Sequence, residues 1–369
     1  MNGSRVCAPA ELERFAHAII QSMGADDEVA GAVAGHLVRA NLVGHDSHGV
    51  LRLPQYVAQA AAGELAPAAR PVLLRESAVT ALLDGRQGFG HFATRVALDW
   101  AITHARAHGL AAVAVRHAGH IGRLGEYAER AADQGLIAIV TVGAAGPGAG
   151  VMAPQGGQQR FLGPNPWAIG VPASDHPPMI VDISTSAIAE GKIRLARAMG
   201  VPLPPGCISD RDGHPSTNPA DFYAGGALLP VGGETSGHKG YGLALASALI
   251  GGLAMIGDDA PSLISGPPAS AGTGHRGHIG GVFLAVVDPA TFATAGDYTA
   301  LVGDTLAAAT RVPPARGVQE VLVPGEPEVR TRRQRAREGI PLPDATWHDL
   351  GEIATRFGVS LPAASQGSL

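Results

Sequence analysis

One segment in the middle of the chain constrains the fold more than any other. Residues 110–115 and 136–142 are apolar runs of strand length, and a helical pattern over residues 123–134 separates them. A strand, a helix and a second strand in this order are typical of a sheet with crossover helices, so the segment predicts an α/β fold. Ligands of such folds gather beyond the ends of the strands. His117 and His120 follow the first of these two strands.

Further helices and strands flank this unit. Apolar residues recur three and four positions apart over several stretches, and glycine follows many of them, as it does at helix ends. The expected helices cover residues 10–23, 27–44, 47–62, 93–108, 184–199, 243–256, 302–311, 331–338 and 347–357. The expected strands cover residues 79–83, 168–172, 179–183, 282–287 and 318–323. Residues 258–280 are rich in glycine, proline and serine and are expected to form an irregular flap.

The composition narrows the class of protein. Of the 369 residues, 46% are hydrophobic and 16% are charged, which fits a packed globular chain. The net charge of −5 shows no excess of basic residues, which argues against a nucleic-acid-binding protein. Two cysteines, Cys7 and Cys207, cannot form a disulfide framework, and no secretory signal is visible, so we expect a reducing, cytoplasmic location. The run from Leu243 to Ile256 is too short to span a bilayer and predicts a buried helix.

Three stretches raise the question of a nucleotide site. The glycines of residues 146–150 are spaced GxGxG and no helical pattern follows, so we reject a Rossmann dinucleotide fingerprint there. Residues 232–242 place Lys239 among glycines before a helix, which suits contact with a phosphate or ribose. The three hydroxyls of residues 184–186, at a predicted turn from strand to helix, either cap that helix or bind a phosphate.

The densest group of reactive side chains lies in residues 44–54. Ser47 is a suitable N-cap for the predicted helix over 47–62, in which His48 and Arg52 share one face. Arginine is the preferred fork for a carboxylate, and a histidine can serve as a general acid or base near neutral pH. The residues therefore favour a polar pocket for a small organic acid.

Two other interpretations of the histidines remain open at this level. His45 and His48, like His117 and His120, are spaced to share a zinc ion, although no HExxH motif or cysteine partner accompanies them. Each histidine could instead be a structural residue, which is the default in a chain with 15 of them. A zinc hydrolase and a binding protein without activity are therefore the alternatives from other classes.

Several short blocks follow one another along nearly the whole chain. They are GHDSHG at 44–49, RLP at 52–54, HIGR at 120–123, GPNP at 163–166, VDISTS at 181–186, HKGYG at 238–242 and PGE at 324–326. In these blocks and their order the chain resembles the malate/L-lactate dehydrogenase family, which lacks a Rossmann fold. It departs from the family at residues 117–119, where small polar residues such as Asn-Ser are usual.

The resemblance implies an architecture and a reaction. The fold would be a non-Rossmann NAD(P)-binding α/β sandwich, with a helical domain from residues 1–75 and 300–369 and an α/β cofactor-binding domain from residues 76–299. The protein would be a homodimer with sites between domains. It would exchange a hydride between NAD, or NADP, and a small 2-hydroxy acid or its 2-oxo acid. Reduction of a cyclic imino acid or of a sugar-derived 2-oxo acid on the same scaffold is the near alternative.

The resemblance also assigns roles to particular residues, and no metal is among them. His48 would be the proton relay, with Ser47 and Asp182 beside it, and Arg52 would hold the substrate carboxylate. His120 belongs to the same pocket and is described as the base in some members, so the choice between the two histidines stays open. The implied cofactor contacts are His48, Gly122, Arg123, Leu124, Ile180, Val181, Asp182, Ile183, Ser184, His238, Lys239, Gly325 and Glu326.

Overall fold

A mixed seven-stranded sheet forms the centre of the computed structural model, which describes residues 3–147, 150–255 and 279–367. The strand order is β2-β3-β4-β11-β5-β6-β7. Among the described strands, β3 and β4 pair in parallel and every other neighbouring pair is antiparallel. The predicted α/β class is therefore confirmed. The strands are β2 (Val72–Glu76), β3 (Thr80–Asp84), β4 (Leu110–Arg116), β5 (Ile137–Ala145), β6 (Trp167–Val171), β7 (Met179–Ile183) and β11 (Ile279–Val287).

The predicted strand–helix–strand unit is present as β4, α5 (Gly125–Ala132) and β5. Its two strands do not pair with each other, because β11 lies between them and runs antiparallel to both. Two strands that are each antiparallel to a common neighbour run in the same direction. The segments that follow β4 and β5 therefore emerge at the same edge of the sheet.

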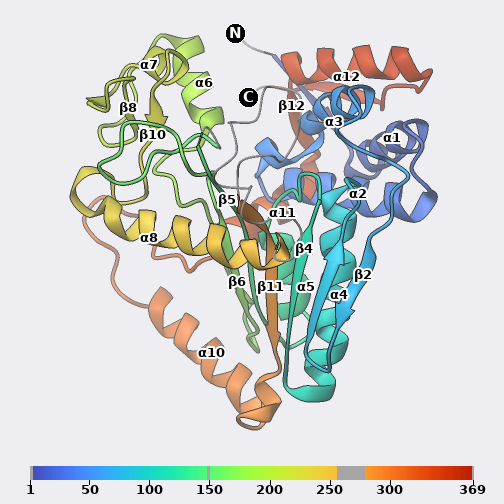
Figure 1. Cartoon of the computed structure of the whole chain (residues 1–369), viewed down its shortest axis with the longest axis vertical. Helices are drawn as coiled ribbons and strands as arrows, with labels where there is room; N and C mark the ends of the chain where they lie inside the picture. Colours follow the sequence, from blue (N-terminus) through green and yellow to red (C-terminus); the bar gives the residue numbers. More distant parts are fainter. Residues whose placement is uncertain (1–2, 148–149, 256–278, 368–369) are drawn as a thin grey trace.

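Helices cover both faces of the sheet (Figure 1). Val113 and Val140 pack in one core with residues of α4 and α5, as alternate residues of a strand do when they share a face. Gly143 faces α8 on the other side, where a Cβ would lie only 2.5 Å from the backbone nitrogen of Ala248. Glycine therefore permits the close approach of this helix. The remaining bounds are α4 (Gly90–His108) and α8 (Gly233–Gly251).

The two ends of the chain meet in a second, mainly helical layer (Figure 1). Leu37, Tyr56, Ile340 and Leu350 are fully or almost fully buried in its core. The predicted division into two domains stays a prediction. The elements are β1 (Ser4–Cys7), α1 (Pro9–Ser22), α2 (Asp27–Leu42), α3 (Leu53–Ala61), β12 (Ile340–Pro343), α12 (Asp344–Phe357) and β13 (Ala364–Gly367), with β1 paired between β12 and β13.

A smaller third core lies beyond β7. Met152, Leu162 and Ile193 are fully buried in it. No helix among the described residues combines the length and apolar character that crossing a bilayer requires. The remaining elements are α6 (Glu190–Met199), β8 (Ile208–Ser209), β9 (Pro215–Ser216), α7 (Pro219–Tyr223), β10 (Ala227–Leu228), η3 (Gly252–Met255), η4 (Pro289–Thr291), α10 (Ala295–Thr310) and α11 (Glu326–Glu338).

The predicted helix over residues 47–62 is wrong in its first part. Two short 3₁₀ turns, η1 (Asp46–His48) and η2 (Val50–Arg52), precede α3. Gly49, with ψ of −156°, is extended and interrupts the helix between the two turns. Ser47 lies inside the first turn and caps no helix, so His48 and Arg52 do not share one face of a continuous α-helix.

Other local predictions also need correction. The hydroxyls of residues 184–186 do not begin a helix, because Thr185 bonds to the carbonyl of Pro164 and α6 begins only at Glu190. Residues 318–323 form no strand. The helix predicted as buried carries Leu243 and Leu249 about half exposed, at 47% and 54%. The irregular flap was expected over residues 258–280. Residues 258–278 lie outside the described part of the chain, and the last two residues belong to β11.

Candidate active site

A cavity of about 300 Å³ lies where the loop before α3 meets β7 and the segment that follows it. This volume is at the lower end of the range for small-molecule sites. The walls combine apolar side chains with hydroxyl, imidazole and guanidinium groups. The lining residues are His45, Ser47, His48, Arg52, Gly122, Arg123, Leu124, Val151, Pro164, Pro166, Asp182, Ser184, Ser186, Ala189, Glu190, Gly191 and Leu228.

The loop that carries His48 is held from two helices. The buried side chain of Asn41, on α2, accepts a hydrogen bond from the backbone of Val50 at 2.9 Å and donates one to Asp46 at 2.6 Å. Arg335, on α11, binds both carboxylate oxygens of Asp46 at 2.7 and 3.0 Å. A Cβ at Gly49 would lie 2.2 Å from the Asn41 side chain. The loop conformation therefore depends on glycine and on this polar anchor.

His48 is a half-buried imidazole beside the cavity. Its Nδ1 lies 2.9 Å from the hydroxyl of Ser47, and its ring stacks on that of His120 with 5.6 Å between centroids. Burial, together with the positive charge of Arg52, lowers the pKa of His48 to about 4. The ring is therefore neutral at physiological pH and can accept a proton. His120 does not line the cavity itself, but it lies directly against a residue that does.

Arg52 is oriented by contacts within its own segment. Its Nε donates to the backbone carbonyl of Ser47 and its Nη1 to the side chain of Gln55, both at 2.7 Å. No hydrogen bond to the described chain occupies Nη2, so this part of the guanidinium is available to an anion. The structure thus brings the predicted proton relay and the predicted carboxylate ligand to one cavity, although not through the helix expected from sequence.

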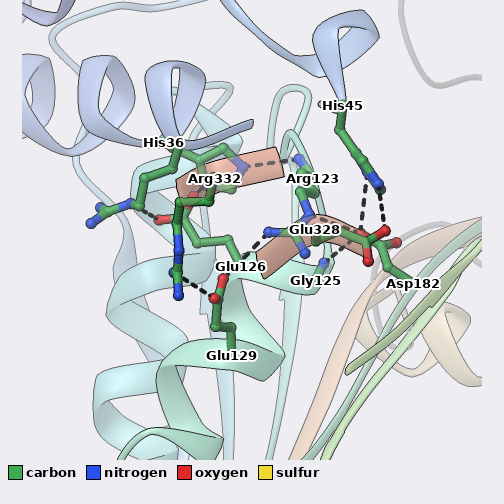
Figure 2. A network of polar contacts seen from close by, with 10 residues as sticks. His36, His45, Arg123, Gly125, Glu126, Glu129, Asp182, Glu328 and Arg332 are labelled. Atoms are coloured by element: carbon green, nitrogen blue, oxygen red, sulfur yellow. Dashed lines mark hydrogen bonds and ion pairs between the residues drawn. The ribbon is translucent and has the colours of Figure 1, made fainter. Parts of the chain in front are cut away.

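Asp182, at the end of β7, is the centre of a polar network (Figure 2). Its carboxylate accepts a hydrogen bond from the backbone of Gly125 at 2.8 Å and lies 3.4 Å from Nε of Arg123. His45 connects this network to α11, because its ring lies 3.9 Å from Asp182 and 3.2 Å from Glu328. The hydrogen bond from His45 lowers the pKa of Glu328. This network fixes one wall of the cavity.

Sequence reasoning missed the buried support of this wall. The Arg123 side chain is 2% exposed, and its backbone nitrogen donates to His36 at 2.9 Å. The other nitrogen of His36 lies 2.9 Å from Glu126, which also pairs with Arg39 (Figure 2). The available signal was a histidine among the apolar residues of the predicted helix over 27–44, because a polar side chain in such a position must find a buried partner.

The implied cofactor residues divide into two sets. Gly122, Arg123, Leu124, Asp182 and Ser184 line the cavity together with His48. The others lie elsewhere: Ile180, Val181 and Ile183 are on β7, His238 and Lys239 are exposed on α8, Gly325 packs against Ile180, and Glu326 pairs with Arg330. Apolar walls suit a nicotinamide ring, and the partly exposed hydroxyl of Ser184 can accept a hydrogen bond from a ribose, so the residues present fit the implied cofactor.

The zinc interpretation gains no geometric support. Within the described ranges, no group of three or more histidine, cysteine, aspartate or glutamate side chains could hold a metal ion. His117 turns to Asp84 at 3.1 Å, whereas His120 turns to Tyr56 at 2.8 Å. The two histidines of this loop are therefore engaged with different partners.

Comparison with known proteins gives a consistent result over the whole chain. The family model described as malate/L-lactate dehydrogenase matches residues 7–351. The chain is 35% identical to hydroxycarboxylate dehydrogenase B of Escherichia coli, covering 94% of this chain and 93% of that one, and 34% identical to L-sulfolactate dehydrogenase of Methanocaldococcus jannaschii, covering 93% and 94%. Among solved structures, it is similar to malate dehydrogenase from Entamoeba histolytica, with a TM-score of 0.87, 26% identity and 98% and 100% coverage. A putative malate/lactate dehydrogenase from E. coli gives a TM-score of 0.84 at 34% identity, with 96% of each chain covered.

Proposed function

Because the chain belongs to the malate/L-lactate dehydrogenase family and is an oxidoreductase acting on hydroxy acids, we propose that its cavity at His48 interconverts a small 2-hydroxy acid and the matching 2-oxo acid. One observation carries this proposal: His48 and Arg52 line the same cavity. A neutral imidazole and a guanidinium with a free edge are the two groups that such an acid requires, one for its hydroxyl proton and one for its carboxylate.

The proposed mechanism uses the described side chains as follows. Arg52 binds the carboxylate and fixes C2 of the acid near His48. His48 takes the hydroxyl proton during oxidation and returns it during reduction, while Ser47 holds the other ring nitrogen. Asp182, with Arg123, keeps the opposite wall in place. When bound, the nicotinamide supplies the redox chemistry, as hydride acceptor in one direction and hydride donor in the other.

The nicotinamide cofactor is proposed to be NAD, or NADP, bound along Gly122–Leu124 and the end of β7. The cavity residues Leu124, Val151 and Pro164 offer apolar contact to a flat ring, and Ser184 offers a hydroxyl to a sugar. These residues would hold the ring beside the acid, where it would exclude water and supply the hydride exchange. His238, Lys239, Gly325 and Glu326 remain proposed contacts for the distant part of the cofactor.

A homodimer is proposed on the basis of apolar surface, and a cytoplasmic location on the basis of the two free cysteines, Cys7 and Cys207. Leu243 and Leu249 on α8, and Leu253 in the turn η3 that follows it, are each about half exposed. Leu253 and Phe283 line the same groove beside β3 and β4. Large apolar surfaces of this kind mark sites of protein association. A second copy of the chain, docking through this face, would cover them.

A substrate panel tests the proposed reaction. Small 2-hydroxy acids are offered with NAD and NADP, and the matching 2-oxo acids with the reduced cofactors, while the absorbance of the reduced nicotinamide is followed. Cyclic imino acids and sugar-derived 2-oxo acids form a second arm. The reason is that this chain is 34% identical to Δ1-pyrroline-2-carboxylate reductase of Ancylobacter novellus, with 94% of this chain and 97% of the reductase covered. Turnover of 2-oxo acids above that of imines supports the proposal. Turnover confined to imines, or absent from every arm, contradicts it.

A further inference from the structure

We propose that Tyr56 is a positioning residue that fixes the proton of His120 on Nε2, so that His120 cannot serve as the proton acceptor and His48 alone exchanges the proton. This inference rests on the proposed function and deepens it. It decides between two histidines that the sequence could not separate.

The argument begins with the hydroxyl of Tyr56, which lies behind the cavity on α3. Its side chain is 1% exposed, and its oxygen lies 2.8 Å from Nδ1 of His120 and 3.3 Å from Nε2 of His91. A phenol has one proton to donate and can accept others. Tyr56 can therefore donate to one of these two nitrogens only, and the other nitrogen must itself donate for both contacts to be hydrogen bonds.

His91 decides the direction. This residue, on α4, is 2% exposed, and its Nδ1 is buried without a hydrogen-bond partner in the described chain. If Nδ1 carried the proton, an N–H group would be buried and unsatisfied, and orphaned donors are rarer than under-used acceptors. Burial and the nearby His36 hold the pKa of His91 well below its usual value, so the ring is neutral. Its single proton is then on Nε2 and is donated to Tyr56.

The consequence passes to His120. Because Tyr56 accepts from His91, it donates its own proton to Nδ1 of His120, which is also the shorter contact. Burial, with Arg52 and His48 nearby, lowers the pKa of His120 to about 3, so this ring is neutral as well. A neutral imidazole that accepts at Nδ1 carries its proton at Nε2. In the two hydrogen bonds that join His91, Tyr56 and His120, His91 therefore donates to Tyr56 and Tyr56 donates to His120.

The two histidines of the site therefore have different capacities. His120 has one nitrogen occupied by Tyr56 and the other already protonated, so it offers a donor and no free acceptor. Within the part of the chain that the structure describes, His48 is bonded only by Ser47, at Nδ1, and a serine hydroxyl can accept as well as donate. In oxidation the C2–H bond breaks and its hydride goes to the nicotinamide, while the hydroxyl proton goes to the ring nitrogen of His48 that Ser47 does not hold. His120, stacked on His48, instead supports the ring that exchanges the proton.

Histidine-selective ¹⁵N NMR of the full-length enzyme measures the tautomer directly. The His120 signals are assigned by comparison with a His120→Gln variant. In the wild type we expect Nδ1 of His120 to show the shift of an unprotonated acceptor and Nε2 that of a protonated nitrogen, without titration near neutral pH. The observation of a proton on Nδ1, or of an even mixture of tautomers, would overturn the inference.

Tyr56→Phe keeps the aromatic packing and removes the hydroxyl. We expect the His120 nitrogens to lose their wild-type shifts in this variant. We also expect kcat to fall roughly 10-fold with the KM for the cofactor unchanged, because the ring that stacks on His48 is no longer held in place. Tyr127→Phe is the matched control, because Tyr127 is equally buried and its hydroxyl bonds to the Ile121 carbonyl, next to His120. Equal changes of the His120 shifts in both variants would reduce the effect to general loosening of the core and contradict the role of Tyr56.

The NMR readout needs no turnover, so the two proposals can fail separately. If the wild-type sample turns over no acid in the substrate panel, the proposed function fails whatever tautomer His120 has. If the sample turns over an acid and His120 carries its proton on Nδ1, the proposed function stands and the role of Tyr56 is refuted.

Discussion

Ser47 orients both of the side chains on which the proposed reaction depends. Its hydroxyl holds Nδ1 of His48 and its backbone carbonyl holds Nε of Arg52. At the residue scale, catalysis therefore depends on the bonds that each side chain has already made before the substrate arrives. The remaining free positions, one nitrogen of the imidazole and one edge of the guanidinium, are the positions that can act on an acid.

His48→Ala tests the proton relay. We expect the variant to bind the nicotinamide cofactor as the wild type does and to lose roughly 10²- to 10⁴-fold in turnover, because general acid–base catalysis contributes that much. Cofactor affinity is measured by fluorescence titration and turnover by initial rates in both directions. Turnover close to that of the wild type would remove His48 from the mechanism.

Arg52→Leu tests the carboxylate contact. Loss of charged hydrogen bonds should raise KM for the acid by roughly 10- to 100-fold and leave KM for the cofactor nearly unchanged. Arg52→Lys is the comparison, because it keeps the charge and loses the planar fork, and we expect an intermediate KM. An unchanged KM for the acid in the leucine variant would place the carboxylate elsewhere.

At the scale of elements, the His48 loop depends on α2 and α11, which lie far apart in sequence. Arg335 connects them through Asp46. Among the described residues, Arg337 on the same helix bonds only to the carbonyl of Arg333, one turn earlier. This pair of arginines separates a general effect of charge on α11 from a specific effect on the loop.

Arg335→Ala should therefore lower kcat/KM about 10-fold and destabilise the fold by about 1–3 kcal/mol, because a part-buried carboxylate loses its partner. Arg337→Ala should change neither quantity beyond about 0.5 kcal/mol. Initial rates and urea unfolding measure both. Equal behaviour of the two variants would show that the contact with Asp46 does not hold the loop.

A second element-scale contact joins α2 to α5. Burial raises the pKa of Glu126, but the opposing effect of His36 and Arg39 is larger. The resulting pKa is about 2, which is below the usual value of a glutamate. A carboxyl whose pKa is lower in the folded state than in the unfolded state stabilises the fold above its unfolded pKa of about 4.3. That stability is lost as the pH falls toward 2.

Glu126→Gln should lower the free energy of unfolding at neutral pH by about 3 kcal/mol, because it breaks a buried charge pair. The difference from the wild type should shrink as the pH falls below about 4.3, where the wild-type carboxyl in the unfolded state is protonated. Glu352→Gln, in an exposed pair with His348, is the control and should have little effect. A difference independent of pH would mean that packing, and not charge, joins these helices. Urea unfolding followed by circular dichroism at several pH values measures this.

At the scale of the whole molecule, the groove beside β3 and β4 and the exposed leucines at positions 243, 249 and 253 point to association. Leu249→Asp combined with Leu253→Asp should shift the protein from dimer to monomer, because each charge would have to be buried in the interface. Leu301→Asp, at a residue that is 64% exposed on α10, is the control and should leave the dimer intact. Light scattering after size exclusion measures the mass. A monomeric wild type, or a variant that remains dimeric, would contradict this interface.

Much of the fold could be predicted because periodicity reports which side of an element is buried. The helices α1, α2, α4 and α12 and the strands β4, β5, β6 and β7 were predicted close to their observed bounds. Short strands such as β1, β12 and β13 were missed, because strands of four residues carry too little pattern. The strand predicted at residues 318–323 was wrong. These residues have the apolar composition of a strand, but no neighbouring strand pairs with them.

The sequence by itself determined the α/β class and placed the reactive residues 44–54 and His120 among the candidates, because residue chemistry and local spacing are properties of the chain alone. Asp182 became a candidate only through the resemblance to the dehydrogenase family. Only the tertiary structure decided that β11 separates β4 from β5, that Arg335 anchors the His48 loop and that Tyr56 lies behind His120. These contacts join segments far apart in the chain. Their formation depends on how whole faces pack and which buried polar groups find partners, and no local pattern contains that information.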